Sequence, residues 1–172
     1  MMPSIQNMDL RSTKAMAQWP IARLSRSLVP VRSIVARLRP WLRQPVSLGK
    51  GEQRLTPKAI GDLGERMAAE WLWASGRKVL YRNFRAPEGG EVDIVAREGD
   101  VLCFIEVKTR TQKGYGRPLD AVDLDKQKLI DRGATEWLRL LGTRDLPWRF
   151  DVMEVILQEG ERPEFTYIKD AF

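Results

Sequence analysis

Four charged side chains interrupt two short apolar runs that flank a Glu-Gly-Asp turn. Glu91 and Asp93 belong to the first run, and Glu106 and Lys108 belong to the second. Three carboxylates that meet in a partly buried place repel one another, and one lysine cannot neutralise them. A divalent cation can, and Mg²⁺ takes one or two carboxylates together with waters and substrate phosphates. A lysine beside such an ion orients or helps to deprotonate a water, so this set suits attack on a phosphodiester.

These side chains converge only if the two runs pair as a hairpin in the right register. Side chains alternate along a strand, so Glu91 shares a face with Asp93. Glu106 shares a face with Lys108 for the same reason. A two-residue loop that contains Gly99 places Asp93 and Glu106 on one face, whereas a three-residue loop without a bulge separates them. The alternative is that all four charges lie on the solvent face of an amphipathic hairpin and make only weak surface contacts.

The composition excludes several other kinds of site. The 172 residues contain no histidine, which rules out Ser-His-Asp hydrolysis, histidine general bases and His-ligated zinc. The single cysteine, Cys103, cannot form an internal disulfide or a thiolate zinc site, and its apolar neighbours predict a buried thiol. One cysteine suits a reducing compartment, and no apolar run approaches the roughly 18 residues of a membrane span. We therefore expect a cytoplasmic protein without integral membrane association.

The positive charge of the chain, +6 overall, is unevenly distributed. Residues 1–58 contain 11 Lys and Arg and two acids, whereas residues 59–172 contain 18 Lys and Arg and 21 acids. The basic character therefore belongs to the N-terminal third. It does not indicate that the rest of the chain binds DNA.

Residues 1–56 are expected to form a basic, disordered N-terminal extension. The stretch 20–45 is rich in Arg, Ser and Pro and contains no acid, and it offers at most one short amphipathic helix between Pro30 and Pro40. Four interpretations fit such a segment: an arm that binds nucleic acid, a helix on an anionic membrane, an organelle transit peptide, or an extension without function. Composition alone does not choose among them.

The elements that must position the charges are expected in residues 57–172, which we take as one domain. Thr56-Pro57 predicts the start of a helix, and Gly76 predicts its end. The apolar periodicity predicts a second helix from about Leu119 to Leu141. This order of helices and strands predicts an α/β fold with a mixed central sheet flanked by helices. The expected strands are 78–85, 91–97, 101–110, 149–157 and 164–169.

The spacing of the hairpin charges is similar to a known signature. Asp93, followed by Glu106-Val107-Lys108, resembles the motif of the PD-(D/E)XK nuclease superfamily, although the proline position is not matched. Residues 61–172 resemble the YraN-like family of bacterial proteins, which is regarded as nuclease-like. The resemblance implies a restriction-endonuclease-like α-β-β-β-α-β core, as in archaeal Holliday-junction resolvases. The matching pieces are GDLGERMAAEWL, RNFR, GGEVDIVA, FIEVKTR, YGRPLDAV, KQK, RFDV and IKDAF.

The resemblance also implies a function. It implies a metal-dependent endonuclease that hydrolyses phosphodiester bonds in DNA, including branched or damaged DNA, with RNA as an alternative substrate. Asp93, Glu106 and Glu65 would ligate Mg²⁺ or Mn²⁺, Lys108 would position the attacking water, and Glu91 would assist. Because related resolvases act as dimers on two-fold substrates, a homodimer is expected. The competing interpretations are a nucleic-acid-binding module without catalysis and an adaptor or assembly protein on a nuclease-like fold.

Four basic residues near the hairpin and in the second helix are candidate contacts for a nucleic-acid backbone. Arg110 and Lys113 follow the second strand of the hairpin, where they would guide the backbone towards the carboxylates. Lys126 and Lys128 match a basic point of the family in the second helix. Ordinary solvated charges remain the alternative for all four.

Overall fold

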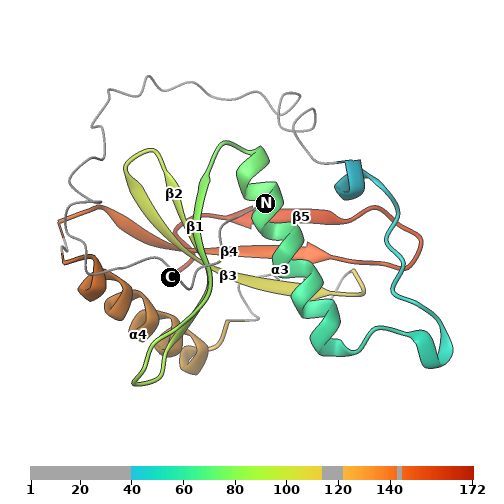
Figure 1. The fold of residues 1–172 in the computed structure, drawn as a ribbon, viewed down its shortest axis with the longest axis horizontal. Helices are drawn as coiled ribbons and strands as arrows, with labels where there is room; N and C mark the ends of the chain where they lie inside the picture. Colours follow the sequence, from blue (N-terminus) through green and yellow to red (C-terminus); the bar gives the residue numbers. More distant parts are fainter. Residues whose placement is uncertain (1–39, 114–121, 143–144) are drawn as a thin grey trace, which may run out of the picture.

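A five-stranded mixed sheet with one helix on each face forms the centre of the protein (Figure 1). The computed structural model describes residues 40–113, 122–142 and 145–172. The predicted order of elements and the α/β fold with an α-β-β-β-α-β core are confirmed. The elements are two short 3-10 helices, η2 (Pro40–Arg43) and η3 (Gly51–Gln53), then α3 (Pro57–Ala74), β1 (Lys78–Arg85), β2 (Glu91–Glu98), β3 (Val101–Arg110), α4 (Leu124–Leu141), β4 (Trp148–Ile156) and β5 (Glu164–Ile168).

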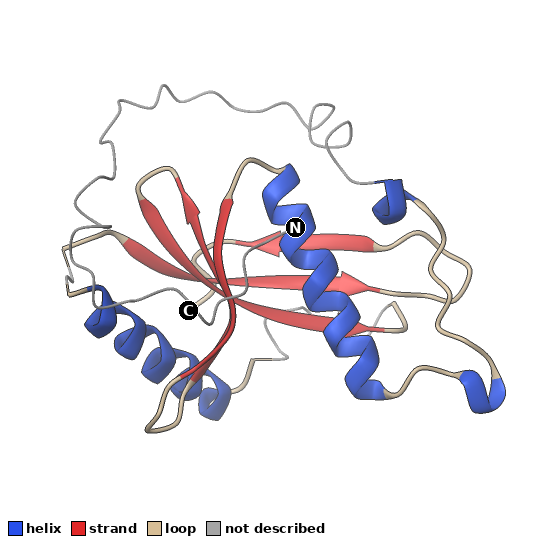
Figure 2. Ribbon diagram, in the orientation of Figure 1, coloured by secondary structure: helices blue, strands red, loops and turns tan. Residues whose placement is uncertain are grey.

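The strands lie side by side in chain order (Figure 2). Only β3 and β4 run parallel, and α4 makes the crossover between them, while every other neighbouring pair is antiparallel. Strand β3 is the central strand and is buried on both faces. Its odd-numbered residues from Cys103 to Val107 pack towards α3, and Leu102 and Phe104 pack towards α4. The two apolar faces explain why this run reads as almost continuously hydrophobic.

Each helix begins at the side chain of a capping residue. The hydroxyl of Thr56 accepts a hydrogen bond from the Ala59 amide at 3.2 Å, as the sequence predicts for α3. Helix α4 was predicted from about residue 119 but begins at Leu124, because the Asp123 carboxylate accepts the Lys126 amide at 2.8 Å and caps the helix there. Residues 119–121 lie outside the described residues. Gly142, with φ of 71°, ends the helix in the left-handed conformation.

The segment that precedes α3 is part of the folded unit. Leu42, Val46 and Leu48 are buried in the same cluster as Met67 and Leu72 of α3. The Val46 amide donates to the Glu161 carbonyl at 2.8 Å, and the Gly160 amide donates to the Val46 carbonyl at 2.9 Å. The predicted boundary between residues 56 and 57 is therefore too late, because the apolar side chains of 42–48 complete the core. Residues 1–39 lie outside the described part of the chain.

Two further expectations concern the single cysteine and the lack of a membrane span. Cys103 is fully buried, as predicted, and burial raises the pKa of its thiol to about 11. In the residues that the structure describes, no helix has the length and apolar character that crossing a membrane requires.

Candidate functional site

The β2–β3 hairpin adopts one of the two registers that bring the carboxylates together. Glu98 pairs with Val101, so the loop has two residues and begins with Gly99 at φ of 61°. Pairing continues to Ile94 opposite Ile105. One step further, Asp93 lies opposite Glu106, and there the backbone ladder stops.

The strands separate at this point because a side chain replaces a backbone partner. The Val107 amide of β3 donates to Oδ2 of Asp93 at 2.8 Å. Strand β2 continues to pair with β1 as far as Glu91, whereas β3 continues with β4 as far as Arg110. The carboxylates therefore lie where the two central strands diverge.

Glu106 is the most deeply buried acid of the group, with a side chain that is 3% exposed. Its Oε1 lies 2.9 Å from the Lys108 ammonium and 3.2 Å from the Lys126 ammonium. Its Oε2 is buried and has no hydrogen-bond partner. A buried carboxylate oxygen without a donor is costly, and the Asp93 side chain, which is hydrogen-bonded to Glu106, is near enough to share a proton or a cation with it.

The nearby charge of Glu106 affects the protonation of Asp93. Burial, followed by the negative charge of Glu106, raises the pKa of the Asp93 carboxyl to about 8. The hydrogen bond from Val107 opposes the shift but does not reverse it. Without a cation, Asp93 therefore holds a proton at neutral pH, and a bound cation would displace that proton.

Glu91 is the acid whose charge is already balanced. It forms ion pairs with Arg85, at 2.7 Å, and with Lys126 of α4. The hydrogen bond from Lys126 is the main cause that lowers the pKa of Glu91, against the effect of burial. Helix α4 approaches β2 this closely because Gly133 has no side chain: a Cβ there would lie 3.0 Å from the Glu91 backbone.

Lys126 is a functional candidate whose position the sequence analysis missed. The sequence predicts a phosphate contact, with a solvated helix face as the alternative, but the side chain of Lys126 is only 20% exposed and lies between Glu91 and Glu106. The signal was present, since Lys126 precedes Ile130 by four residues and Gly133 by seven, on the buried stripe of α4. A lysine on such a stripe points towards the sheet.

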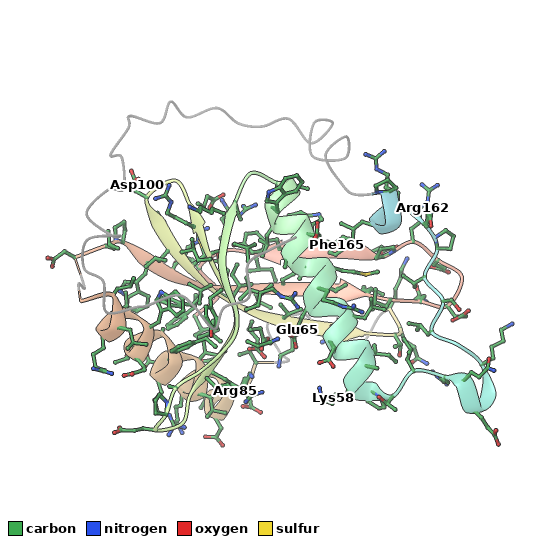
Figure 3. The ribbon with its side chains drawn as sticks, in the orientation of Figure 1. Lys58, Glu65, Arg85, Asp100, Arg162 and Phe165 are labelled. Atoms are coloured by element: carbon green, nitrogen blue, oxygen red, sulfur yellow. The ribbon has the colours of Figure 1, made fainter. Side chains whose placement is uncertain are left out.

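Glu65 belongs to α3, which covers the face of the sheet opposite to α4 (Figure 3). Its side chain is hydrogen-bonded to Asn83 of β1. Burial is the main cause that raises the pKa of Glu65, and the charges of Asp62 and Glu106 add to it. The influence of Glu106 places Glu65 within electrostatic reach of the carboxylates at the divergence of β2 and β3.

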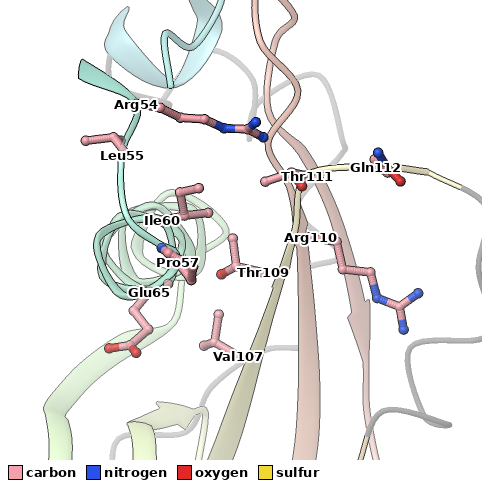
Figure 4. A pocket seen from close by; sticks show the side chains of 11 residues that line it. Arg54, Leu55, Pro57, Ile60, Glu65, Val107, Thr109, Arg110, Thr111 and Gln112 are labelled. Atoms are coloured by element: carbon pink, nitrogen blue, oxygen red, sulfur yellow. The ribbon is translucent and has the colours of Figure 1, made fainter. Parts of the chain in front are cut away.

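A cleft of about 850 Å³ begins at Glu65 (Figure 4). It lies between the start of α3 and the end of β3, and Arg54, Thr109 and Arg110 contribute polar groups to its lining. Gly64 allows the helix to lie against Thr109, because a Cβ there would overlap the threonine hydroxyl. Among the candidate acids, Glu65 is the one that lines this cleft.

The remaining basic candidates are engaged in ion pairs. Arg110 lies 3.2 Å from Glu154 of β4, and Lys113 lies 2.5 Å from Glu164 of β5. Lys128 is exposed and pairs with Asp125 at 2.9 Å, so it does not join the carboxylates. Of the four predicted basic contacts, the structure brings only Lys126 to the centre of the site.

The donor set fits a divalent cation supported by few protein ligands. No group of three or more acidic or cysteine side chains is arranged to hold a metal ion within residues 40–113, 122–142 and 145–172. Asp93 and Glu106 nevertheless provide two adjacent carboxyl groups, one of them with a bare buried oxygen. Mg²⁺ typically takes one or two carboxylates and completes its shell with water and phosphate. The residues present therefore suit Mg²⁺ or Mn²⁺.

Comparison with known proteins covers the region that holds these residues. Residues 64–155 match the model of the uncharacterised protein family UPF0102. A UPF0102 protein of Trichlorobacter lovleyi is 44% identical over 126 residues, which is 73% of this chain and 94% of the relative. The UPF0102 proteins of Rhodococcus jostii (44% over 114 residues, 66% of this chain and 96% of the relative) and Geobacter sulfurreducens (43% over 122 residues, 71% and 94%) are comparably similar. With nearly the whole length of each relative aligned, the chain belongs to family UPF0102.

Proposed function

We propose that this protein is a divalent-cation-dependent endonuclease of the PD-(D/E)XK type that hydrolyses phosphodiester bonds in DNA. The observation that carries the proposal is the pair of adjacent buried carboxyl groups of Asp93 and Glu106, in which burial and the charge of Glu106 raise the pKa of Asp93. A structural ion pair would give each acid a basic partner. A site that receives a cation leaves two acids side by side.

The residues divide the chemistry among them. Asp93 and Glu106 would hold Mg²⁺ or Mn²⁺, with Glu65 as a further ligand from α3. The ion would lower the pKa of a bound water and balance the charge that develops on the phosphate. Lys108, fixed by Glu106 at 2.9 Å, orients the attacking water at the edge of the group. Lys126 balances Glu91 and Glu106, so that Glu91 supports the site through that lysine.

The substrate class follows from charge and shape. The cleft beside Glu65 is open to solvent and Arg54 lines it, so an anionic backbone could approach Glu65 along it (Figure 4). Residues 59–172 have more acids than bases, so attraction to DNA must come from such local groups and from the basic N-terminal third. Action in the cytoplasm, and as a dimer on branched DNA, belongs to the same proposal.

The decisive experiment combines cleavage with ion binding. The purified full-length protein is incubated with Mn²⁺ or Mg²⁺ and a panel of linear, flapped and four-way-junction DNA and RNA. We expect cleavage of at least one DNA substrate, loss of cleavage with a chelator, and a rise in Tm when the ion is added. Glu106→Gln should abolish both cleavage and the ion-dependent rise. Glu136→Gln, which changes a partly exposed glutamate paired with Arg139 on α4, is the matched control and should retain both.

The outcomes separate the enzyme from its competitors. Binding of nucleic acid without cleavage, and without any effect of the ion on Tm, would indicate a non-catalytic binding module. If the protein neither binds nucleic acid nor responds to the ion, an adaptor built on the same fold is the better interpretation. Cleavage of RNA alone would change the substrate class but keep the site.

A further inference from the structure

Asn83 has an unusual backbone conformation in the middle of β1. Its φ is 55°, and Asp170 is the only other non-glycine residue of the described ranges with a positive φ. Residues with a Cβ rarely adopt this left-handed region, and asparagine tolerates it better than most. An interruption of this kind inside a paired strand needs a reason.

The position of Asn83 in the ladder connects it to the site. Arg82 pairs with Ile94 and Phe84 pairs with Val92, so Asn83 lies opposite Asp93. The strand does not lose its register there. The left-handed residue is therefore level with the point at which β2 leaves β3.

In both β1 and β2, the alternation of side chains between the two faces of the sheet is broken near Asn83 and Asp93. Tyr81 and Phe84 are three residues apart, yet both rings contact Trp137 of α4, with centroids at 5.2 and 5.1 Å. On β2, Val92 and Val95 are also three residues apart and pack in the same cluster on the α4 side. Strict alternation would place each pair on opposite faces. Two residues on each strand, including Asn83 and Asp93, therefore absorb a local rotation of the ladder.

The side chain of Asn83 points to the other half of the site. Its carboxamide is hydrogen-bonded to the Glu65 carboxylate, which comes from α3. One residue thus contacts the acid that the helix contributes and sits level with the acid that the sheet contributes.

We propose that Asn83 is a positioning residue of the catalytic site: its left-handed backbone turns the β1–β2 ladder so that Asp93 faces Glu106, and its carboxamide holds Glu65 towards the same cation. This inference rests on the proposed function, because it assigns Asn83 a role in assembling the cation ligands. Asn83 itself contacts neither cation nor substrate.

Two substitutions of Asn83 distinguish the contribution of its backbone conformation from that of its carboxamide. Asn83→Gly keeps the left-handed conformation and removes the carboxamide, so its Tm should stay within a few degrees of wild type. Its affinity for Mn²⁺, measured by electron paramagnetic resonance, should fall about tenfold, which is typical for loss of a group that orients a ligand. Asn83→Ala should lose as much affinity and also lower Tm by several degrees, because its Cβ disfavours the left-handed backbone.

A double-variant cycle decides whether Asn83 acts through Glu65. If it does, Asn83→Gly should not weaken Mn²⁺ binding further in the Glu65→Gln background. An Asn83→Gly variant with wild-type affinity, or full additivity in the cycle, would overturn the positioning role while leaving the proposed function intact. If the wild-type protein takes up no Mn²⁺, the proposed function fails and this inference fails with it.

Discussion

Two groups of buried charges lie at opposite ends of the β2–β3 hairpin, and they are built differently. The turn group contains Glu98 and Asp151 with their partners Arg77, Arg149, Tyr167 and Lys169. The divergence group contains Glu91, Asp93, Glu106, Lys108 and Lys126, with Glu65 close by. Both groups place acids in the interior of one small domain. They can therefore be compared by the partners that each group gives to its carboxylates.

In the turn group, every carboxylate oxygen has a partner. Oε1 of Glu98 accepts Arg77 at 2.7 Å and Oε2 accepts Arg149 at 2.5 Å. Asp151 is fully buried, and it accepts both Arg149, at 2.8 and 3.0 Å, and the Tyr167 hydroxyl. Although burial acts to raise the pKa of Glu98, hydrogen bonds from Lys169 and Arg149 lower it overall. These contacts join β2, β4 and β5, as expected of a structural network.

In the divergence group, the acids lack enough basic partners to balance their charges. Two lysines share Oε1 of Glu106 while Oε2 has none, and the pKa of Asp93 rises to about 8 rather than falling. The difference teaches that buried acids alone do not indicate a site. The indication is an acid left without the partners that the same fold supplies to its other acids.

The largest difference should appear in activity. Lys108→Ala should reduce cleavage by about a thousandfold, because the water loses the group that orients it. Its Mn²⁺ affinity should change by no more than a few fold, since an ammonium is not a metal ligand. Single-turnover cleavage and paramagnetic resonance measure the two quantities. Lys78→Ala, which removes an exposed lysine at the start of β1, is the control and should cleave normally. Equal losses in both variants would contradict the role of Lys108.

The turn group should show the opposite behaviour. Arg149→Ala leaves the buried Asp151 without the Nε–H group that both of its oxygens share and should lower the free energy of unfolding by about 3 kcal/mol. For a domain of this size, Tm should fall by about 10 °C. Affinity for Mn²⁺ should not change. Lys169→Ala removes a half-exposed partner of Glu98 and should cost less than about 1 kcal/mol. A change in ion affinity in Arg149→Ala would mean that the two groups are not independent.

These two groups were not equally predictable from the sequence. The convergence of Asp93 and Glu106 followed from strand alternation and from the demand for glycine in a two-residue loop, both of which are local rules. The pairing of Glu98 with Arg149 joins residues 51 positions apart across the sheet, and no local pattern contains it. The lack of a basic partner at Oε2 of Glu106 could not be predicted from the sequence either, because it depends on the positions of side chains from several distant segments.

Three further features of the structure could not be predicted, or were not predicted, from the sequence. The burial of Leu42, Val46 and Leu48 was missed because the basic composition of the N-terminal third concealed a few apolar residues. The position of Lys126 was readable from the stripe of α4, but only by treating a lysine as part of an apolar face. The left-handed Asn83 had no signal, since its neighbours favour an ordinary strand.

The role of Lys126 sharpens the comparison, because within the described ranges it is the lysine that bridges two acids of the divergence group, Glu91 and Glu106. Lys126→Met keeps the apolar stem and removes the charge, so Glu91 and Glu106 lose a counterion. Without divalent ions, we expect a loss of about 2 kcal/mol in the free energy of unfolding. Added Mn²⁺ should raise Tm more in this variant than in wild type, since it supplies the missing positive charge. A smaller ion-dependent rise than in wild type would show that Lys126 is needed to hold the ion.

The smallest effect is expected from Asp93→Asn, and its sign is the informative part. The pKa of Asp93 rises from 3.8 to about 8 on folding, so the folded protein binds more protons than the unfolded chain between these values. The stability of the ion-free wild type should therefore fall as the pH rises from about 4 to about 8, and the asparagine variant lacks this loss. At pH 8 we expect Asp93→Asn to be more stable than wild type, because the variant does not have to bury a second negative charge beside Glu106. Urea denaturation at several pH values measures the difference.

Saturating Mn²⁺ should reverse the order of the two proteins. The ion replaces the proton of Asp93 in wild type and stabilises it, whereas the asparagine provides a neutral and weaker ligand. Asp131→Asn, an exposed acid on α4, is the control and should follow wild type at every pH. If Asp93→Asn is less stable than wild type in ion-free solution at pH 8, Asp93 is an ordinary partner like Asp151. The contrast between the two groups would then no longer support a cation site.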